Sequence, residues 1–201
     1  MAPAALPWRT DLFTGRTLLV AGPAGPFGPA TASAWRALGG HALESPGGDA
    51  PAADEQLAAA WANAGTLDTL VVLASDVPAD PEHFDPMLWR EGVETGLSHA
   101  WYLMQAGARQ WHDRGRPGNI VLLMPAYRET RPRCQLRRAV GASIAHLAKT
   151  VAVEWAAHAV RVNGIAPHID DSAAVADAVV WLSAPSGKFV TGEVMNLGAR
   201  R

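Results

Sequence analysis

The chain has 201 residues, of which 49% are apolar and 18% are charged, and its net charge at pH 7 is −2. This apolar fraction excludes a disordered chain, and the near-neutral charge gives no basis for electrostatic nucleic-acid binding. The single cysteine, Cys134, excludes an internal disulfide. No apolar run reaches the roughly 18 residues of a membrane span, and the first residues lack the apolar core of a signal peptide. We therefore expect one cytoplasmic domain over residues 1–201, and its sparse charge favours an oligomer.

Short apolar runs alternate with helical patterns along the whole chain. The runs that indicate strands are 17–21, 41–44, 69–74, 119–124, 160–165 and 190–197. The segments that indicate helices are 31–38, 54–63, 84–114, 136–158 and 172–182. Residues 45–54 are rich in proline, glycine and alanine, and we expect them to form a surface loop.

Strands of continuous apolar character that are separated by helices are typical of a parallel sheet covered on both faces. The sequence thus predicts a doubly wound α/β domain with three layers. The helix at 136–158 carries an apolar stripe at intervals of three and four residues, with alanines on the neighbouring faces. Two interpretations remain open: plain core packing, or a core stripe on one side and a subunit interface on the other. The stripe consists of Leu136, Val140, Ile144, Leu147, Val151 and Trp155.

Five segments in order resemble the short-chain dehydrogenase/reductase family, over about Leu12 to Leu197. They are LFTGRTLLVAGPAGPFG, GTLDTLVVLAS, GNIVLLMP, ASIAHLAKTVAVEWAAHAVRVNGIAP and FVTGEVMNLG. The resemblance implies a Rossmann-like sheet that is abridged in two places. Residues 40–68 leave little room for the family's usual second helix and third strand. The family's long substrate loop is missing after Pro167, because the next helical pattern follows almost at once.

The family's dinucleotide turn reads TGxxxGxG, and the resemblance places Gly22 and Gly28 at its first and third glycines. Pro26 stands at the second glycine, where the backbone approaches the pyrophosphate. Proline lacks an N–H group, so Pro23, Pro26 and Pro29 together remove three possible donors. We therefore expect no bound cofactor, with Gly22 and Gly28 as vestiges of a dinucleotide site.

The family's catalytic tetrad consists of Asn, Ser, Tyr and Lys. The resemblance places Gly96, Pro125, Arg137 and Gly141 at these four positions. Glycine and proline offer no side-chain group, and arginine stays protonated near neutral pH. Tyr127 is the one tyrosine close to these positions in the sequence. Conventional activity of the family is therefore not expected.

An arginine cluster lies near the former active site: Arg131, Arg133, Arg137 and Arg138. The cluster indicates either a site for an anion or an acidic partner, or a solvated surface.

Three other polar features remain open. His168, Asp170 and Asp171 follow a strand and form either an acid/base or metal cluster, or a turn with a helix N-cap. Glu44 either bonds a ribose or lies in solvent. The histidines show no zinc-like spacing, so we expect no metal.

These features favour a catalytically inactive subunit that assembles with a complete dehydrogenase/reductase and stabilises it. The association, with that partner or as a homodimer, would use the helices at 84–114 and 136–158. Two alternatives remain: an enzyme with cofactor-independent chemistry in the emptied pocket, or a module that senses an anion or nucleotide. We expect neither nucleic-acid nor membrane binding.

Overall fold

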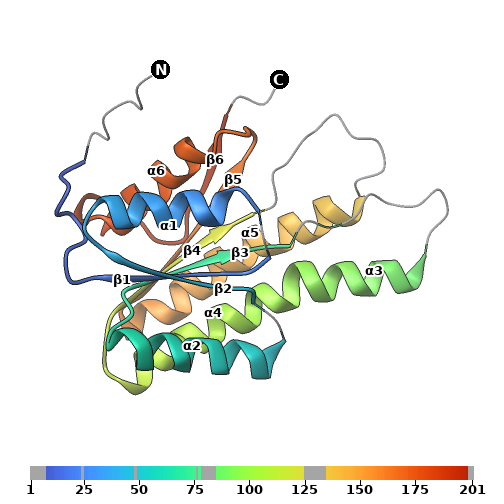
Figure 1. Cartoon of the computed structure of the whole chain (residues 1–201). Coiled ribbons are helices and arrows are strands. Elements are labelled where there is room, and N and C mark those ends of the chain that lie inside the picture. The colour runs from blue at the N-terminus through green and yellow to red at the C-terminus, as the bar shows by residue number, and fades with distance from the viewer. Residues whose placement is uncertain are drawn as a thin grey trace.

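The computed structural model describes residues 8–23, 25–47, 49–75, 77, 85–124 and 135–198. Six strands form one sheet in which every neighbouring pair is parallel. Across the sheet their order is β2-β1-β3-β4-β5-β6 (Figure 1). The strands are β1 (Thr17–Ala21), β2 (His41–Ser45), β3 (Thr69–Leu73), β4 (Gly118–Leu123), β5 (Val160–Pro167) and β6 (Val194–Leu197).

Helices cover both faces of the sheet. On one face α1 (Phe27–Ala37) packs beside α6 (Ser172–Ser183), and on the other α2 (Ala50–Ala64), α4 (His99–Asp113) and α5 (Gln135–Trp155) enclose a second core (Figure 1). The short α3 (Pro86–Val93) continues into α4 through a π-helical segment, η1 (Glu94–Ser98). Two 3₁₀ turns, η2 (Ala156–His158) and η3 (Pro185–Gly187), follow α5 and α6. The predicted three-layer, doubly wound α/β fold is confirmed.

Both cores are built around large side chains. Trp111 is fully buried between α4 and the sheet, and its indole donates a 2.7 Å hydrogen bond to the carbonyl of Leu67. On the other face the rings of Phe13 and Trp35 stack with centroids 3.6 Å apart. No helix in the described ranges contains a stretch long and apolar enough to cross a membrane.

The predicted α5 stripe faces the core. Leu136, Val140, Ile144 and Val151 are buried, whereas Leu147 and Trp155 are partly buried against the same cluster.

Helix α2 begins four residues earlier than predicted, so the loop predicted over 45–54 is wrong in its second half. The Asp49 side chain caps the helix by accepting a hydrogen bond of 3.1 Å from the N–H of Ala52, and Pro51 lies in the first turn. Both residue types are favoured at a helix start, although the Pro/Ala/Gly composition looked loop-like. Helix α1 likewise begins four residues before the predicted start, at Phe27.

The last strand begins at Val194 and not at Val190. Two polar residues of β5 hold the preceding loop instead. Arg161 donates hydrogen bonds of 3.1 Å to the carbonyls of Leu182, Gly187 and Val190, and burial lowers the pKa of this guanidinium. Asn163 is fully buried and also donates to Val190, at 2.9 Å. The Val190 carbonyl therefore bonds side chains and not a strand neighbour.

The abridgement expected from the family resemblance is present only in part, because residues 40–68 do hold a helix of 15 residues, α2, but no further strand among the described residues. Within the described residues, α2 is the single regular element between β2 and β3, so β2 forms the edge of the sheet. Residues 168–171 alone separate β5 from α6, which leaves no room for a long loop after Pro167.

Candidate functional site

The strand order places a crevice at the carboxyl end of β1. The chain runs from β1 outward to β2 at the edge, then crosses back to β3 on the other side of β1. Helices α1 and α2 accordingly lie on opposite faces of the sheet. In open α/β sheets, ligands bind where the strand order reverses in this way. The candidate site is therefore the carboxyl edge between β1 and β3.

Gly22 occupies this point directly after β1. Its φ is +134°, and a Cβ at this position would overlap the carbonyl oxygen of Leu73 at the end of β3. The N–H of Gly22 donates a 3.0 Å hydrogen bond to the carbonyl of Ser45 at the end of β2. A Cβ on Gly28 would lie 3.0 Å from Cδ1 of Leu73. The two glycines therefore let α1 start close against the ends of three strands.

The prolines of this turn fit the start of α1. Pro26 is the N-cap residue and Pro29 lies in the first turn, positions at which a backbone N–H has no acceptor within the helix. No side chain in the described structure caps this helix. In the described ranges the N–H groups of Phe27 and Gly28 have no side-chain partner, and they lie at the positive end of the helix dipole. Gly25 has open space around its Cα, since a Cβ there would meet no atom within 4 Å.

A side-chain brace, which the sequence analysis missed, fixes the loop after β2. The Gln56 amide oxygen accepts from Ser45 Oγ at 2.5 Å and from the Gly47 N–H at 3.2 Å, and its Nε2 donates to the Gly47 carbonyl at 2.8 Å. A Cβ on Gly47 would lie 3.0 Å from the Cα of Gly22. The brace thus holds one wall of the crevice against the glycine turn. No motif marks Gln56, because its partners lie in a different element.

Glu44, the candidate ribose ligand, lies exposed at the end of β2. Its Oε1 accepts a hydrogen bond of 3.1 Å from Arg36 on α1. The carboxylate retains a second oxygen as an acceptor, so both interpretations of Glu44 remain predictions.

Three of the four aligned tetrad positions lie within the described residues. Gly96 is buried in η1, where a Cβ would lie 2.8 Å from Val140 and 3.0 Å from Val77. Arg137 is 9% exposed, and its Nη2 and Nε donate to the carbonyl of Val77 at 2.8 and 3.2 Å. Arg137 therefore anchors the segment after β3. Gly141 has open space around it, with no atom within 4 Å of a Cβ.

Several of the predicted site residues lie outside the part of the chain that the structure describes. Pro125, Tyr127, Arg131, Arg133 and Cys134 lie outside the described residues. The structure therefore does not test the arginine cluster or the full set of tetrad positions, and both stay predictions.

Of the cluster after β5, Asp171 caps α6 by accepting from the N–H groups of Ala173 and Ala174 at 3.0 and 3.1 Å. His168 Nε2 lies 3.1 Å from Oδ1 of Asn196. In the part of the chain that the structure describes, no group of three or more His, Cys, Asp or Glu side chains is placed to hold a metal.

Known proteins with similar sequences are named dehydrogenases and reductases. No protein-family model matches the sequence. Gluconate 5-dehydrogenase of Gluconobacter oxydans is 30% identical over 121 residues, which cover 59% of this chain and 47% of that protein. A probable 2,4-dienoyl-CoA reductase of Bacillus subtilis is 30% identical over 106 residues, 51% of this chain and 42% of that protein. The chain thus aligns with somewhat less than half the length of these relatives.

Solved structures match the fold over nearly the whole chain. A short-chain dehydrogenase from Mycobacterium smegmatis superposes with a TM-score of 0.83 at 19% identity, covering 100% of this chain and 98% of that one. A 7α-hydroxysteroid dehydrogenase in complex with NADH and 7-oxo glycochenodeoxycholic acid gives a TM-score of 0.79 at 18% identity, over 94% and 95% of the two chains. The fold is that of the short-chain dehydrogenases, and the sequence similarities support the resemblance to this family.

These comparisons correct two expectations. The interpretation as an inactive subunit that stabilises an active relative is wrong, because the similar proteins are named as dehydrogenases and reductases. The expectation that no cofactor binds is wrong as well, since a protein of the same fold holds NADH. Both expectations rested on missing side chains and donors. The structure gives the physical reason for the second error: Pro26 and Pro29 replace N–H groups at a helix start, where two other N–H groups remain.

Proposed function

We propose that this chain binds a nicotinamide dinucleotide at the carboxyl edge of β1 and acts as an oxidoreductase of the short-chain dehydrogenase/reductase kind. The observation that carries the proposal is the position of Gly22, whose positive φ and close approach to Leu73 place the glycine turn at the point where the strand order reverses. The names of the similar proteins support the same activity.

The residues around the turn fit the diphosphate of such a cofactor. The uncapped N-terminus of α1 offers the N–H groups of Phe27 and Gly28 to an anion. Gly25 adds no atom that would block its approach. On the other side, the Gln56 brace keeps the β2 loop beside Gly22, and Glu44 lies at the end of β2 where a ribose hydroxyl would reach it. Fewer donors than in the family's usual turn are available, so we expect weaker binding.

A bound nicotinamide would supply or accept the hydride of the reaction. In this proposal the family's usual positions do not donate or accept the proton, because Gly96, Arg137 and Gly141 carry no side-chain group that exchanges a proton near neutral pH. Arg137 instead positions the segment after β3 through the Val77 carbonyl and keeps a positive charge beside this edge of the sheet. The proton donor and the substrate are therefore expected to differ from the family's usual ones.

The test is a titration of the protein with NADH and with NADPH, followed by nicotinamide fluorescence. Gly25→Asp places a carboxylate in the open space above the turn and should weaken binding by about tenfold or more through charge repulsion, without disturbing packing. Gly15→Asp is the matched control, because it makes the same charge change in open space before β1 and aspartate tolerates its φ of +75°. The absence of saturable binding of either nucleotide, or an equal loss in both variants, would contradict the proposal.

We further propose that two copies of the chain associate through α4 and α5. Val153 on α5 is 79% exposed, and Trp101 of α4 stacks on Trp155 of α5 with centroids 5.9 Å apart. Both indole rings are only partly buried. These are apolar groups on α4 and α5 that a partner would cover.

A further inference from the structure

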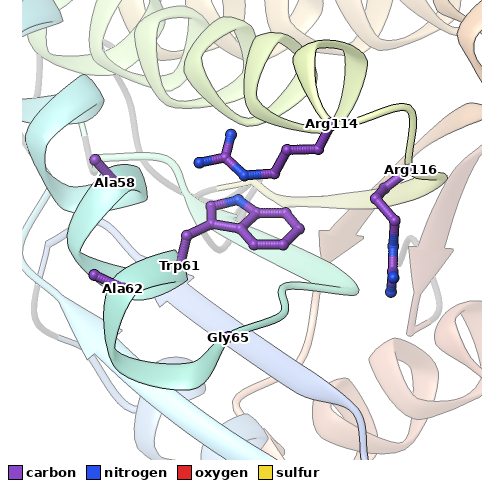
Figure 2. Close-up of a pocket in the computed structure, with 6 residues that line it drawn as sticks. All are labelled: Ala58, Trp61, Ala62, Gly65, Arg114 and Arg116. Atoms are coloured by element: carbon purple, nitrogen blue, oxygen red, sulfur yellow. The ribbon is translucent and has the colours of Figure 1, made fainter.

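An open, shallow cavity of about 460 Å³ lies at the opposite edge of the sheet from the glycine turn. Figure 2 shows its lining side chains, which come from the end of α2 and from the segment between α4 and β4. Both segments lead into the starts of strands, β3 and β4, so the cavity is at the amino edge of the parallel sheet. It is lined by Ala58, Trp61, Ala62, Gly65, Arg114 and Arg116.

Two arginines give this cavity a positive charge that no carboxylate in the described ranges neutralises. Among the described residues, no carboxylate lies within 4.0 Å of the guanidinium of Arg114 or Arg116. By contrast, Arg109 near the end of α4 pairs with Asp54 of α2 at 2.6 Å. Asp113 is adjacent in sequence and exposed, but it does not line the cavity. The ion pair at Arg109 shows that these two helices can neutralise an arginine, and at the cavity they do not.

Each of the two arginines uses only part of its donor capacity. Nη1 of Arg114 donates to the carbonyl of Gln110 at 3.1 Å, and Nη2 of Arg116 approaches Oγ1 of Thr66 at 3.4 Å. A guanidinium has five N–H donors in a planar fork, so several remain for a ligand at each residue.

Trp61 holds Arg114 in place. The guanidinium carbon of Arg114 lies 4.6 Å from the centroid of the indole ring, a cation–π contact. Trp61 is 9% exposed, and its Nε1 is buried without a hydrogen-bond partner. Figure 2 shows the nitrogen edge of the indole turned toward the Arg114 side chain. The indole therefore limits the freedom that Arg114 would lose when an anion binds.

We propose that the cavity binds a small organic phosphate. The phosphate group would lie against the guanidinium of Arg114, whose planar fork matches its oxygens. Figure 2 shows the Arg116 side chain pointing away from Arg114, so Arg116, which is exposed and has one long hydrogen bond, would turn toward the bound phosphate. The organic part would lie over the small residues Ala58, Ala62 and Gly65, which leave the space that a larger side chain would fill. A volume of about 460 Å³ lies within the range of small-molecule sites, about 300–1,000 Å³, and exceeds the needs of a phosphate ion alone.

The experiment is isothermal titration at low ionic strength with two probes, phenyl phosphate and inorganic phosphate. We expect saturable binding of one phenyl phosphate per chain and weaker binding of inorganic phosphate, which lacks the organic part. Arg116→Gln, at an exposed residue with one long hydrogen bond, should weaken phenyl phosphate binding about tenfold while the thermal transition is unchanged. Arg9→Gln is the charge control, since Arg9 is exposed and paired with Asp11; it should bind as the unmodified protein does.

A second variant tests the cavity without removing an arginine. Ala62→Glu adds a negative charge to the lining of the cavity and should weaken binding strongly, whereas Ala59→Glu makes the same change on an exposed face of α2 outside the cavity and should not. Equal binding by the Ala62→Glu and Ala59→Glu proteins would overturn the proposal. So would loss of binding in Gly25→Asp alone, because the probe would then occupy the dinucleotide turn. Nucleotide binding in each variant is measured separately, so failure here leaves the proposed function standing.

Discussion

The approach of Gly22 to Leu73 can be tested by one methyl group. In Gly22→Ala, the new Cβ would overlap the Leu73 carbonyl oxygen and lie 2.7 Å from the Leu73 Cβ, so the end of β1 has to move away from β3. A non-glycine residue at this φ of +134° is strained by about 1–3 kcal/mol. Overpacking against a backbone that cannot yield adds about 1–3 kcal/mol. We expect the variant to lose about 2–6 kcal/mol of unfolding free energy.

Gly15→Ala is the matched control for this substitution. Gly15 has a φ of +75°, and a Cβ there would meet no atom within 4 Å. Its cost is therefore conformational alone, about 1–2 kcal/mol. Urea unfolding of both variants gives the comparison, provided that the slopes with denaturant stay equal. If Gly22→Ala and Gly15→Ala lose the same unfolding free energy within about 0.5 kcal/mol, the close contact between Gly22 and Leu73 does not exist.

Three further predictions follow from the described contacts. Arg161→Ala leaves three carbonyls without their charged donor and should lower the unfolding free energy, measured in urea, by about 2–4 kcal/mol. Arg36→Ala is the control, because it removes only an exposed ion pair; an equal loss in both variants would show that the Arg161 hydrogen bonds do not stabilise the fold. Pro26→Gly adds an N–H at the glycine turn and should tighten NADH binding about tenfold by fluorescence titration, and unchanged or weaker binding would show that Pro26 does not limit the site. Val153→Glu places a charge on the exposed face of α5 and should shift a dimer to a monomer in analytical ultracentrifugation without changing unfolding, whereas a dimer that persists would exclude this face as the interface.

Local sequence patterns predicted most of the secondary structure because they act within one element. The run at 17–21 forms β1 with the predicted limits, and the stripe from Leu136 to Val151 faces the core. Two element ends differ from the predicted ones. Asp49 begins α2 inside a stretch with loop-like composition, and Val190 is held by Arg161 and Asn163 in place of a strand neighbour. Both differences come from hydrogen bonds that composition does not reveal.

The candidate site was predicted only in part. The glycine turn was located from the sequence, but counting lost donors at Pro26 and Pro29 led to the wrong expectation about the cofactor. The brace from Gln56 to Gly47 and the cavity beside Trp61 were not predicted at all. Their residues lie in separate elements and follow no common spacing, so no one-dimensional pattern connects them.

The sequence by itself determined the alternation of buried strands and amphipathic helices, and with it a parallel sheet covered on two faces, because apolar periodicity and strand burial are local properties. The tertiary structure decided which strand lies at the edge, where the strand order reverses, and that Gly22 contacts Leu73 there. It also decided that Arg109 is neutralised by Asp54, whereas Arg114 and Arg116 are left beside an open cavity. These outcomes depend on how the crossover connections bring distant residues together, and that arrangement follows from the packing of whole elements.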